Sequence, residues 1–127
     1  MGTQATPDIT ATVLTRERAQ SHEAEWGDLR WFANAELGNS RDLTVGRCRL
    51  KPGMSNPRHL HPNCDEVLVV LKGRIAHTLS GSSEVELGEG DTISIPRNLA
   101  HQARNIGDTD AELMIVFSSA HRQVQGE

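Results

Sequence analysis

Regularly spaced, short β-rich runs are the feature of this sequence that most constrains its fold. From Leu43 onward, runs rich in valine, isoleucine, leucine and threonine alternate with breaks of glycine, proline, asparagine and serine. The runs read LTVGRCRL, EVLVVL, RIAHTL, EVEL, DTISI, HQARN and ELMIVF. Short strands at this spacing predict an all-β sandwich or barrel, and the chain lacks the strand–helix alternation of α/β folds.

A chain of 127 residues is close to the usual size of a single domain. Its first forty residues differ from the rest, because TRERAQSHEAEW has some helical character and LRWF reads as an edge strand. We expect an N-terminal arm over residues 1–40, a barrel over residues 41–120 and a C-terminal tail over residues 121–127. The arm would cover a sheet or contact a second subunit, and residues 1–10 and 121–127 are expected to be mobile.

Charge and hydropathy argue against two kinds of partner. The net charge is -4 and no long basic stretch is present, which disfavours nucleic acid. The start, MGTQATPDIT, has neither the basic nor the apolar region of a signal peptide, and the longest apolar run, residues 67–71, is too short to span a bilayer. We therefore expect a soluble cytoplasmic protein with no nucleic-acid or membrane partner.

Three histidines and one glutamate gather in two blocks of the sequence. The block GMSNPRHLHPNCDEVLVVLKG holds His59, His61 and Glu66, and the later block GDTISIPRNLAHQARN holds His101. His59 and His61 stand two residues apart, so on a strand they project from the same face. A barrel can return the chain so that His101 faces them. Imidazole and carboxylate ligands suit a divalent transition metal, and four of them leave two positions open on an octahedral ion.

The two blocks resemble the two sequence motifs of the cupins. The first fits G-x5-H-x-H-x4-E-x6-G from Gly53 to Gly73 at every defining position. The second fits G-x5-P-x-G-x2-H-x3-N from Gly90 to Asn105, with Asn98 in place of the usual glycine. Asparagine tolerates left-handed backbone better than most residues, so the turn is expected to survive. The resemblance covers about residues 43–118.

This resemblance to small single-domain cupins implies a double-stranded β-helix, that is, a jelly-roll barrel with a metal bound inside. The metal ligands that it implies are His59, His61, Glu66 and His101. The ion is one divalent transition metal per chain, and iron, manganese, zinc, nickel, cobalt and copper all stay open. Small barrels of this type commonly pair or exchange N-terminal strands, so we expect a homodimer through residues 10–40.

His77 is the predicted catalytic residue. It alternates with Ile75 and Leu79 and would point inward, where a histidine near the metal can act as general acid or base. The alternative is a hydrogen-bonded or surface histidine. Tyrosine is absent from the chain, so no phenol can take this role. Asn105 is expected either to support the site through a hydrogen bond or to close a turn.

A basic cluster and two cysteines leave further alternatives open. Arg47, Arg49 and Lys51 share one face of their strand and would bind a substrate carboxylate or phosphate if that face is inward. The favoured alternative turns Cys48 and Leu50 inward, because three buried cations without partners would be costly. Cys48 then is a small core residue. Cys64, beside the predicted site, is expected to be a free thiol rather than a ligand.

Taken together, these patterns predict a metal-dependent enzyme that acts on a small oxygen-rich organic molecule. The substrate would chelate the ion through two oxygens, as a 2-oxo acid, an enediol or a catechol-like diol can. Oxidative, dioxygenase-type chemistry is the leading interpretation. Non-oxidative isomerase, lyase, cyclase or decarboxylase chemistry with the same ligands is the close alternative. A non-catalytic module that binds a small molecule or a metal is the alternative from another class.

Overall fold

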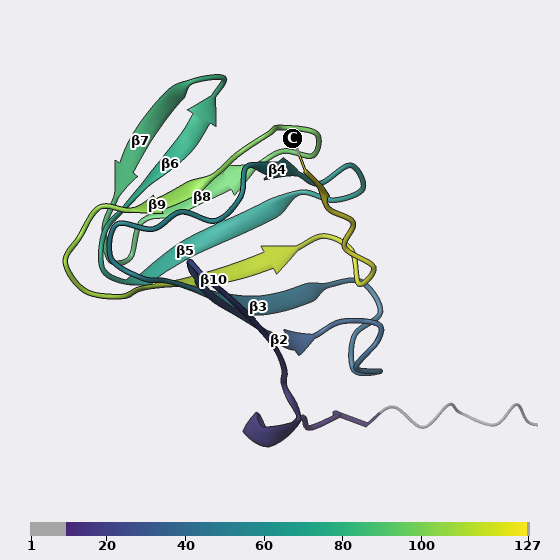
Figure 1. The fold of residues 1–127 in the computed structure, drawn as a ribbon. Helices are drawn as coiled ribbons and strands as arrows, with labels where there is room; N and C mark the ends of the chain where they lie inside the picture. The colour runs from purple at the N-terminus through teal and green to yellow at the C-terminus, as the bar shows by residue number, and fades with distance from the viewer. Residues whose placement is uncertain (1–9, 127) are drawn as a thin grey trace, which may run out of the picture.

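Three antiparallel sheets form the fold in the computed structural model, which describes residues 10–126 (Figure 1). The main sheet has six strands in the order β1-β2-β3-β10-β5-β8. Their bounds are β1 Gln20–Ala24, β2 Gly27–Ala33, β3 Thr44–Leu50, β10 Ala111–Phe117, β5 Glu66–Lys72 and β8 Thr92–Ile95. Because β10 pairs with both β3 and β5, the sheet joins segments that are far apart in the sequence.

Two smaller sheets complete the barrel. One has the order β7-β6-β9, with β6 Ile75–Ser80, β7 Ser83–Leu87 and β9 Ala103–Asn105. The other pairs β4 His59–Leu60 with β11 Gln125–Gly126. Figure 1 shows β6, β7 and β9 on the opposite side of the fold from β2 and β3. Every β-rich run predicted from Leu43 onward forms a strand, and the all-β jelly-roll class is confirmed.

Alternating burial along the strands builds the core between the sheets. On β5, Leu68 is 3% exposed whereas its neighbour Val67 is 39% exposed. On β10, the inward residues Leu113, Ile115 and Phe117 are all buried. This period of two is the pattern of strands with one face in the core, and it gives the barrel interior a largely apolar wall.

The outer face of β3 carries the basic residues. Burial alternates along β3 so that Cys48 and Leu50 point inward, which confirms the favoured alternative for this strand. Arg49 places Nη2 2.6 Å from Asp28 on β2, and Arg47 lies 3.5 Å from the same carboxylate. These arginines therefore hold neighbouring strands together and do not face the barrel interior.

The N-terminal region differs from its expected form. Within the stretch of predicted helical character, residues 16–18 make a single 3-10 turn and β1 takes Gln20–Ala24, so that expectation was wrong. β2 lies inside the sheet because β1, not β2, forms its edge. Residues 1–9 and Glu127 lie outside the described residues, so the mobility expected of them stays a prediction. Across residues 10–126, no helix is long and apolar enough to cross a membrane.

Two turns show why particular residues are needed. Gly73 has φ +84°, and a Cβ there would lie 3.2 Å from Ala111 Cα, so both the conformation and the close packing favour glycine. Asn98 has φ +69°, the left-handed geometry that the sequence predicted it would tolerate at the motif's glycine position. Its backbone N–H donates to the His61 carbonyl oxygen at 2.9 Å, so this turn is tied to the predicted site.

Candidate metal centre

Four side chains from three parts of the chain converge inside the barrel. Their ligand atoms all lie within 4.8 Å of one another, and they belong to His59, His61, Glu66 and His101. Glu66 begins β5, and the first two histidines come from β4 and the residue after it. Three of the four side chains are buried, and His59 is half-buried. The structure thus brings together the four residues that the sequence singled out.

Backbone hydrogen bonds fix the distance between the two blocks. His59 N donates to His101 O at 3.0 Å, and His101 N donates to His59 O at 2.8 Å. The two rings lie 4.4 Å apart between centroids as a result. This reciprocal pair joins the segment before β5 directly to the segment before β9.

Each histidine of the group is oriented by a main-chain carbonyl oxygen. Nδ1 of His59 lies 2.7 Å from Pro57 O, and Nδ1 of His101 lies 2.8 Å from Leu99 O. Nδ1 of His61 lies 2.8 Å from the carbonyl oxygen of Gln123. A carbonyl oxygen can only accept, so each Nδ1 carries the proton and donates. Nε2 of a neutral ring then presents a lone pair, the tautomer that a metal ligand needs.

The Nε2 lone pairs of His61 and His101 point toward the Glu66 carboxylate, and no protein hydrogen-bond donor lies between them. Nε2 of His61 and of His101 lie 3.3 and 3.2 Å from Glu66 Oε1, and all three buried atoms lack a hydrogen-bond partner of good geometry. A nitrogen lone pair and a carboxylate oxygen that face each other repel unless a cation lies between them. Buried polar atoms without partners are costly, and a divalent ion would satisfy all of them at once. The residues therefore fit a metal with nitrogen and oxygen ligands.

The pKa values show how strongly this cluster favours positive charge beside Glu66. Burial alone would raise the pKa of Glu66, but its contacts with His101 and His61 outweigh burial and lower the pKa to about 2. Burial would lower the pKa of His101, yet the Glu66 carboxylate raises it. The pKa of His59 falls to about 4, mainly through burial, so this ring stays neutral and ready to bind a cation near neutral pH.

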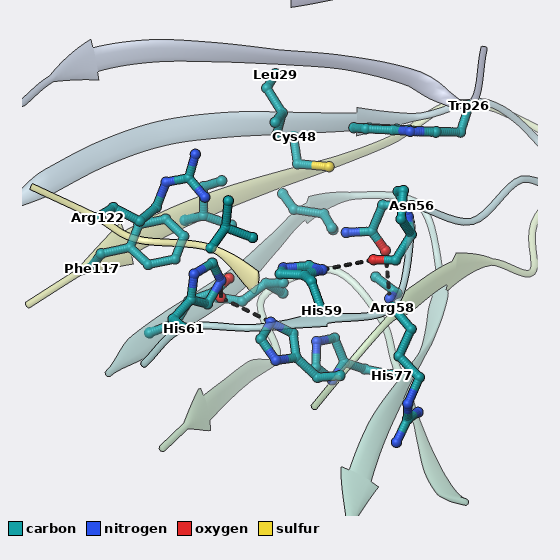
Figure 2. Close-up of a pocket in the computed structure, with 18 of the residues that line it drawn as sticks. Trp26, Leu29, Cys48, Asn56, Arg58, His59, His61, His77, Phe117 and Arg122 are labelled. Carbon is teal, nitrogen blue, oxygen red and sulfur yellow. Dashed lines mark hydrogen bonds and ion pairs between the residues drawn. The ribbon is translucent and has the colours of Figure 1, made fainter. Parts of the chain in front are cut away.

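A cavity of about 460 Å³ opens above the four residues (Figure 2). Its apolar wall comes from β2, β3, β5 and β10 and includes Leu29, Trp31, Leu68, Leu113 and Ile115. Asn56 adds a polar group, since its Oδ1 accepts from Ala103 N at 3.0 Å and leaves the amide N–H groups as donors. A mostly apolar pocket with few convergent polar groups is the usual form of a small-molecule site.

His77 lies at the edge of this group. It is 1% exposed, lines the cavity, and stacks on His101 with 5.6 Å between ring centroids. Its Nδ1 donates to Thr78 O at 2.7 Å, so Nε2 carries the lone pair. The inward orientation predicted for His77 is observed, and its catalytic role stays a prediction.

Residues 120–126, which we call the C-terminal strap, pack against the site rather than extending away as a mobile tail. β11 pairs with β4, and Gln123 supplies the carbonyl oxygen that orients His61. Asn63 clamps the strap, because its Nδ2 donates to His121 O at 2.9 Å and its Oδ1 accepts from Gln123 N at 3.0 Å. The expected mobility of residues 121–126 was therefore wrong. These contacts use mainly backbone groups, which leave no signature in residue type.

Arg122 is a pocket residue that the sequence did not reveal. Its Cζ lies 4.4 Å from the Trp31 ring centroid and 5.3 Å from that of Phe117, and it lines the cavity. The nearest signal in the sequence was the expectation that β2 runs through LRWF, which places Trp31 in the sheet. Nothing in the local sequence HRQVQ indicated that the strap returns to that ring.

The other predicted residues take structural positions. Asn105 donates from Nδ2 to Leu50 O and Thr109 O and accepts from Gly107 N, so it closes a turn, the second of its two expected roles. Cys48 and Cys64 are both buried free thiols, as expected, and neither belongs to the convergent group. Cys48 does border the cavity from β3.

The fold and the convergent group define a class of protein: a jelly-roll barrel with a candidate site for a metal held by three histidines and one glutamate. Residues 46–117 match the family described as "Cupin domain". The chain belongs to the cupin family, as the two sequence motifs predicted.

Curated relatives are longer than this chain. Germin-like protein 3-8 of Oryza sativa subsp. japonica is 37% identical over 94 residues, which are 68% of this chain and 42% of that protein. Oxalate oxidase GF-3.8 of Triticum aestivum is 32% identical over 64% of this chain and 39% of its own length. The chain thus spans about two fifths of the curated relatives that it matches.

Solved structures show the same fold. A recombinant oxalate oxidase in complex with glycolate has a TM-score of 0.73 at 24% identity, over 82% of this chain and 56% of that one. The oxalate decarboxylase of Lactobacillus farciminis, in a formate complex, has a TM-score of 0.79 at 20% identity, over 87% of this chain and 34% of that one. At these identities the likeness establishes the architecture, and the reaction has to be argued from the site.

Proposed function

We propose that this chain is a metal-dependent enzyme that oxidises a small, oxygen-rich organic acid bound through two neighbouring oxygens at a divalent ion. The observation that carries the proposal is the unpartnered, inward-facing Nε2 atoms beside Glu66 at the floor of an apolar cavity. Relatives named oxalate oxidase support a chelating acid as the substrate class. When bound, the ion would act as a Lewis acid for the chelated oxygens and, if redox-active, would make dioxygen chemistry available.

The ligands proposed for the ion are His59, His61, Glu66 and His101. The protein would hold three imidazoles in one tautomer through the carbonyl oxygens of Pro57, Gln123 and Leu99. One carboxylate reduces the charge of a divalent ion only partly, so the occupied site attracts an anionic substrate. Asn56 can donate a hydrogen bond to a substrate oxygen from the rim of the cavity.

His77 is the proposed proton acceptor. Burial lowers its pKa, so the ring is neutral near pH 7 and its Nε2 can take a proton from a bound hydroxyl or carboxyl group. Its Nδ1–H bond to Thr78 O holds the ring in the tautomer that this role needs. A His77→Gln variant is expected to keep its metal and to lose turnover by about 10²-fold or more, as for other general bases.

Oxygen uptake tests the oxidative proposal. The purified protein is first analysed for metal without added ions, and then assayed with oxalate, 2-oxo acids, diols and 1,3-diketones. We expect about one metal per chain, loss of that metal in His101→Ala, and oxygen consumption with at least one acid. Wild-type protein that contains no stoichiometric metal and binds none, or a His101→Ala variant with the parent's metal content, would refute the site.

Non-oxidative chemistry at the same ligands is the second candidate. It is favoured by His77, because an acid–base residue beside the ion is what an isomerase, lyase or decarboxylase requires. Product formation from an acid without oxygen uptake would select this candidate. Ligand binding without turnover of any compound would select a non-catalytic binding module instead.

We also propose a homodimer, formed through the N-terminal strands. β1 is the edge of the main sheet, and on its outer side no further strand pairs with it within residues 10–126. Unpaired edges are ready to pair with another chain. Light scattering coupled to size-exclusion chromatography is expected to give the mass of two chains, and a monomeric mass would contradict this proposal. A cytoplasmic location stays part of the proposal and is testable by fractionation.

A further inference from the structure

Arg122 lines the cavity and forms no direct ion pair with an acid in the described part of the chain. Ion pairs join the arginines of the outer faces to acids, such as Arg49 to Asp28 and Arg104 to Glu84. Arg122, by contrast, forms no ion pair and no side-chain hydrogen bond with any residue in the described part of the chain. It lies over the faces of Trp31 and Phe117, and Glu66 attracts it without a direct contact. A half-buried guanidinium held in this way still needs polar partners for its N–H groups.

The contact with Trp31 leaves those N–H groups usable. Arg122 Cζ lies over the ring, 4.4 Å from its centroid, and this contact occupies none of the five N–H donors with a hydrogen bond. Arg122 keeps this position because Asn63 and β11 fix the strap on either side of it. The side chain is thus a pre-positioned fork of the kind that binds a carboxylate through two hydrogen bonds.

The position of Arg122 relative to the metal centre sets the kind of molecule that it could recognise. Phe117 lies between them, with its ring centroid 5.3 Å from Arg122 Cζ and 4.9 Å from the ring centroid of His61. The guanidinium is therefore no more than about 10 Å from the His61 ring. Figure 2 shows Arg122 and Phe117 beside His61 along the same wall of the cavity. One extended small molecule can reach both ends.

The charged residues that line the cavity also favour a ligand with two anionic groups. Among its lining residues, within the part of the chain that the structure describes, Glu66 supplies the only carboxylate. A divalent ion would more than neutralise it. Arg58 also lines the cavity but donates to Gly81 O, and Arg122 would add a further positive centre beside His61. A ligand with an anionic group at each end matches this distribution, while a ligand with an apolar far end would leave the half-buried guanidinium without an ion pair.

We infer that Arg122 is a specificity-determining residue that binds a second, distal carboxylate of the substrate, so that the enzyme prefers acids with a chelating head and an anionic tail. This inference rests on the proposed function, because it assumes that the chelating head lies at the metal centre. It assigns the chain a substrate longer than a two-carbon acid. Trp31 and Phe117 are the residues that position the guanidinium.

Two pairs of 2-oxo acids test the inference, because each pair shares a chelating head and a chain length and differs only at the far end. 2-Oxoglutarate is compared with 2-oxopentanoate, and 2-oxoadipate with 2-oxohexanoate. Binding to the manganese-loaded full chain is measured by anaerobic isothermal titration calorimetry. We expect wild-type protein to bind at least one dicarboxylate about tenfold or more tightly than its monocarboxylate partner, the effect of a charge-assisted hydrogen-bonded pair.

Variants separate recognition from structure. Arg122→Gln is expected to abolish the preference for the dicarboxylate while leaving affinity for the monocarboxylate and for Mn²⁺ unchanged. Arg122→Lys is expected to keep part of the preference for the dicarboxylate, since lysine has the charge of arginine but cannot form two parallel hydrogen bonds to a carboxylate. Arg104→Gln, which removes an arginine that does not line the cavity, is the matched control and should keep the wild-type preference.

Three results would overturn the inference. They are equal affinity of wild-type protein for both members of each pair (including no binding of either), a preference that survives in Arg122→Gln, and an Arg122→Gln variant that loses Mn²⁺ and both acids alike. Failure of the proposed function is read separately, from metal content and turnover. A charge preference that Arg122→Gln abolishes supports the inference even if no acid is turned over.

Discussion

Removing the side chain of Asn63 should weaken metal binding, although Asn63 touches no ligand atom. Asn63 makes two hydrogen bonds to the C-terminal strap, at 2.9 Å to His121 O and 3.0 Å from Gln123 N. Gln123 in turn accepts the Nδ1–H of His61 at 2.8 Å. Asn63→Ala therefore releases the residue that holds His61 in its metal-binding tautomer.

The expected loss of Mn²⁺ affinity in Asn63→Ala can be worked out from its two lost hydrogen bonds. Both are partly open to solvent, so each is worth about 0.5–1 kcal/mol and together they contribute about 1–2 kcal/mol to keeping the strap closed. If that free energy is taken from metal binding, the Kd for Mn²⁺ rises by about 5- to 30-fold. Loss of a residue that orients a ligand typically weakens a metal site by a similar factor.

The effect of Asn63→Ala on the strap and on the metal can be measured separately and compared with a control variant. Mn²⁺ affinity is measured by calorimetry, and strap opening by hydrogen exchange of the amides of residues 121–126. The control is Asn39→Ala, because Asn39 also accepts one backbone hydrogen bond, from Asn34 N, and donates one, to Phe32 O, but does not line the cavity. It should leave the Mn²⁺ affinity unchanged. Faster exchange in Asn63→Ala at an unchanged Kd would refute the proposed link between strap and ligand.

Three further predictions concern charge, thiol reactivity and packing. In metal-free protein the pKa of Glu66 is lowered to about 2 from an ordinary 4.5. Its ionised form therefore stabilises the fold above pH 4.5, and this contribution is lost as the pH falls toward 2. The free energies of unfolding of wild type and Glu66→Gln, measured in urea, should converge over that range. Burial raises the pKa of Cys48 to about 12, so iodoacetamide at pH 8 should modify it only after denaturation, and rapid modification of the folded protein would contradict this. A Cβ on Gly46 would lie 2.5 Å from Trp31 Cε3 and 2.8 Å from Arg30 O, so Gly46→Ala should cost about 1–3 kcal/mol in urea unfolding, and an unchanged midpoint would contradict this close packing.

The strands and the ligand group could be predicted from the sequence because their signals are local. Period-two alternation marks which residues of β5 and β10 face inward, and it depends only on neighbouring residues. His59 and His61 share a face for the same reason. Placing His101 opposite them needed the second motif, since no local rule tells which strand the chain returns to.

The strap and its arginine could not be predicted, because their placement depends on long-range backbone contacts. Gln123 acts through its carbonyl oxygen, which every residue type carries, so no substitution pattern marks it. Arg122 docks on Trp31, far away in the sequence, and the pairing of β11 with β4 brings them together. Likewise, the cost of burying cations favoured an outward face for Arg47 and Arg49, but their shared ion-pair partner, Asp28 on the neighbouring strand, could be found only in the fold.

The reciprocal backbone bonds between His59 and His101 determine when the metal site forms. These peptide groups hold the two backbone segments together, and the Nδ1–H bonds to Pro57 O and Leu99 O orient the rings, so little conformational entropy remains for an ion to remove. Zinc fingers behave differently, because they fold only on binding metal. We expect a chelator to strip the ion and leave a folded barrel that exchanges one divalent metal for another. A site preformed to this degree has the affinity order for divalent metals that most nitrogen and oxygen sites share. Affinity alone therefore does not select one ion, and the metal supplied during growth decides which ion the site carries.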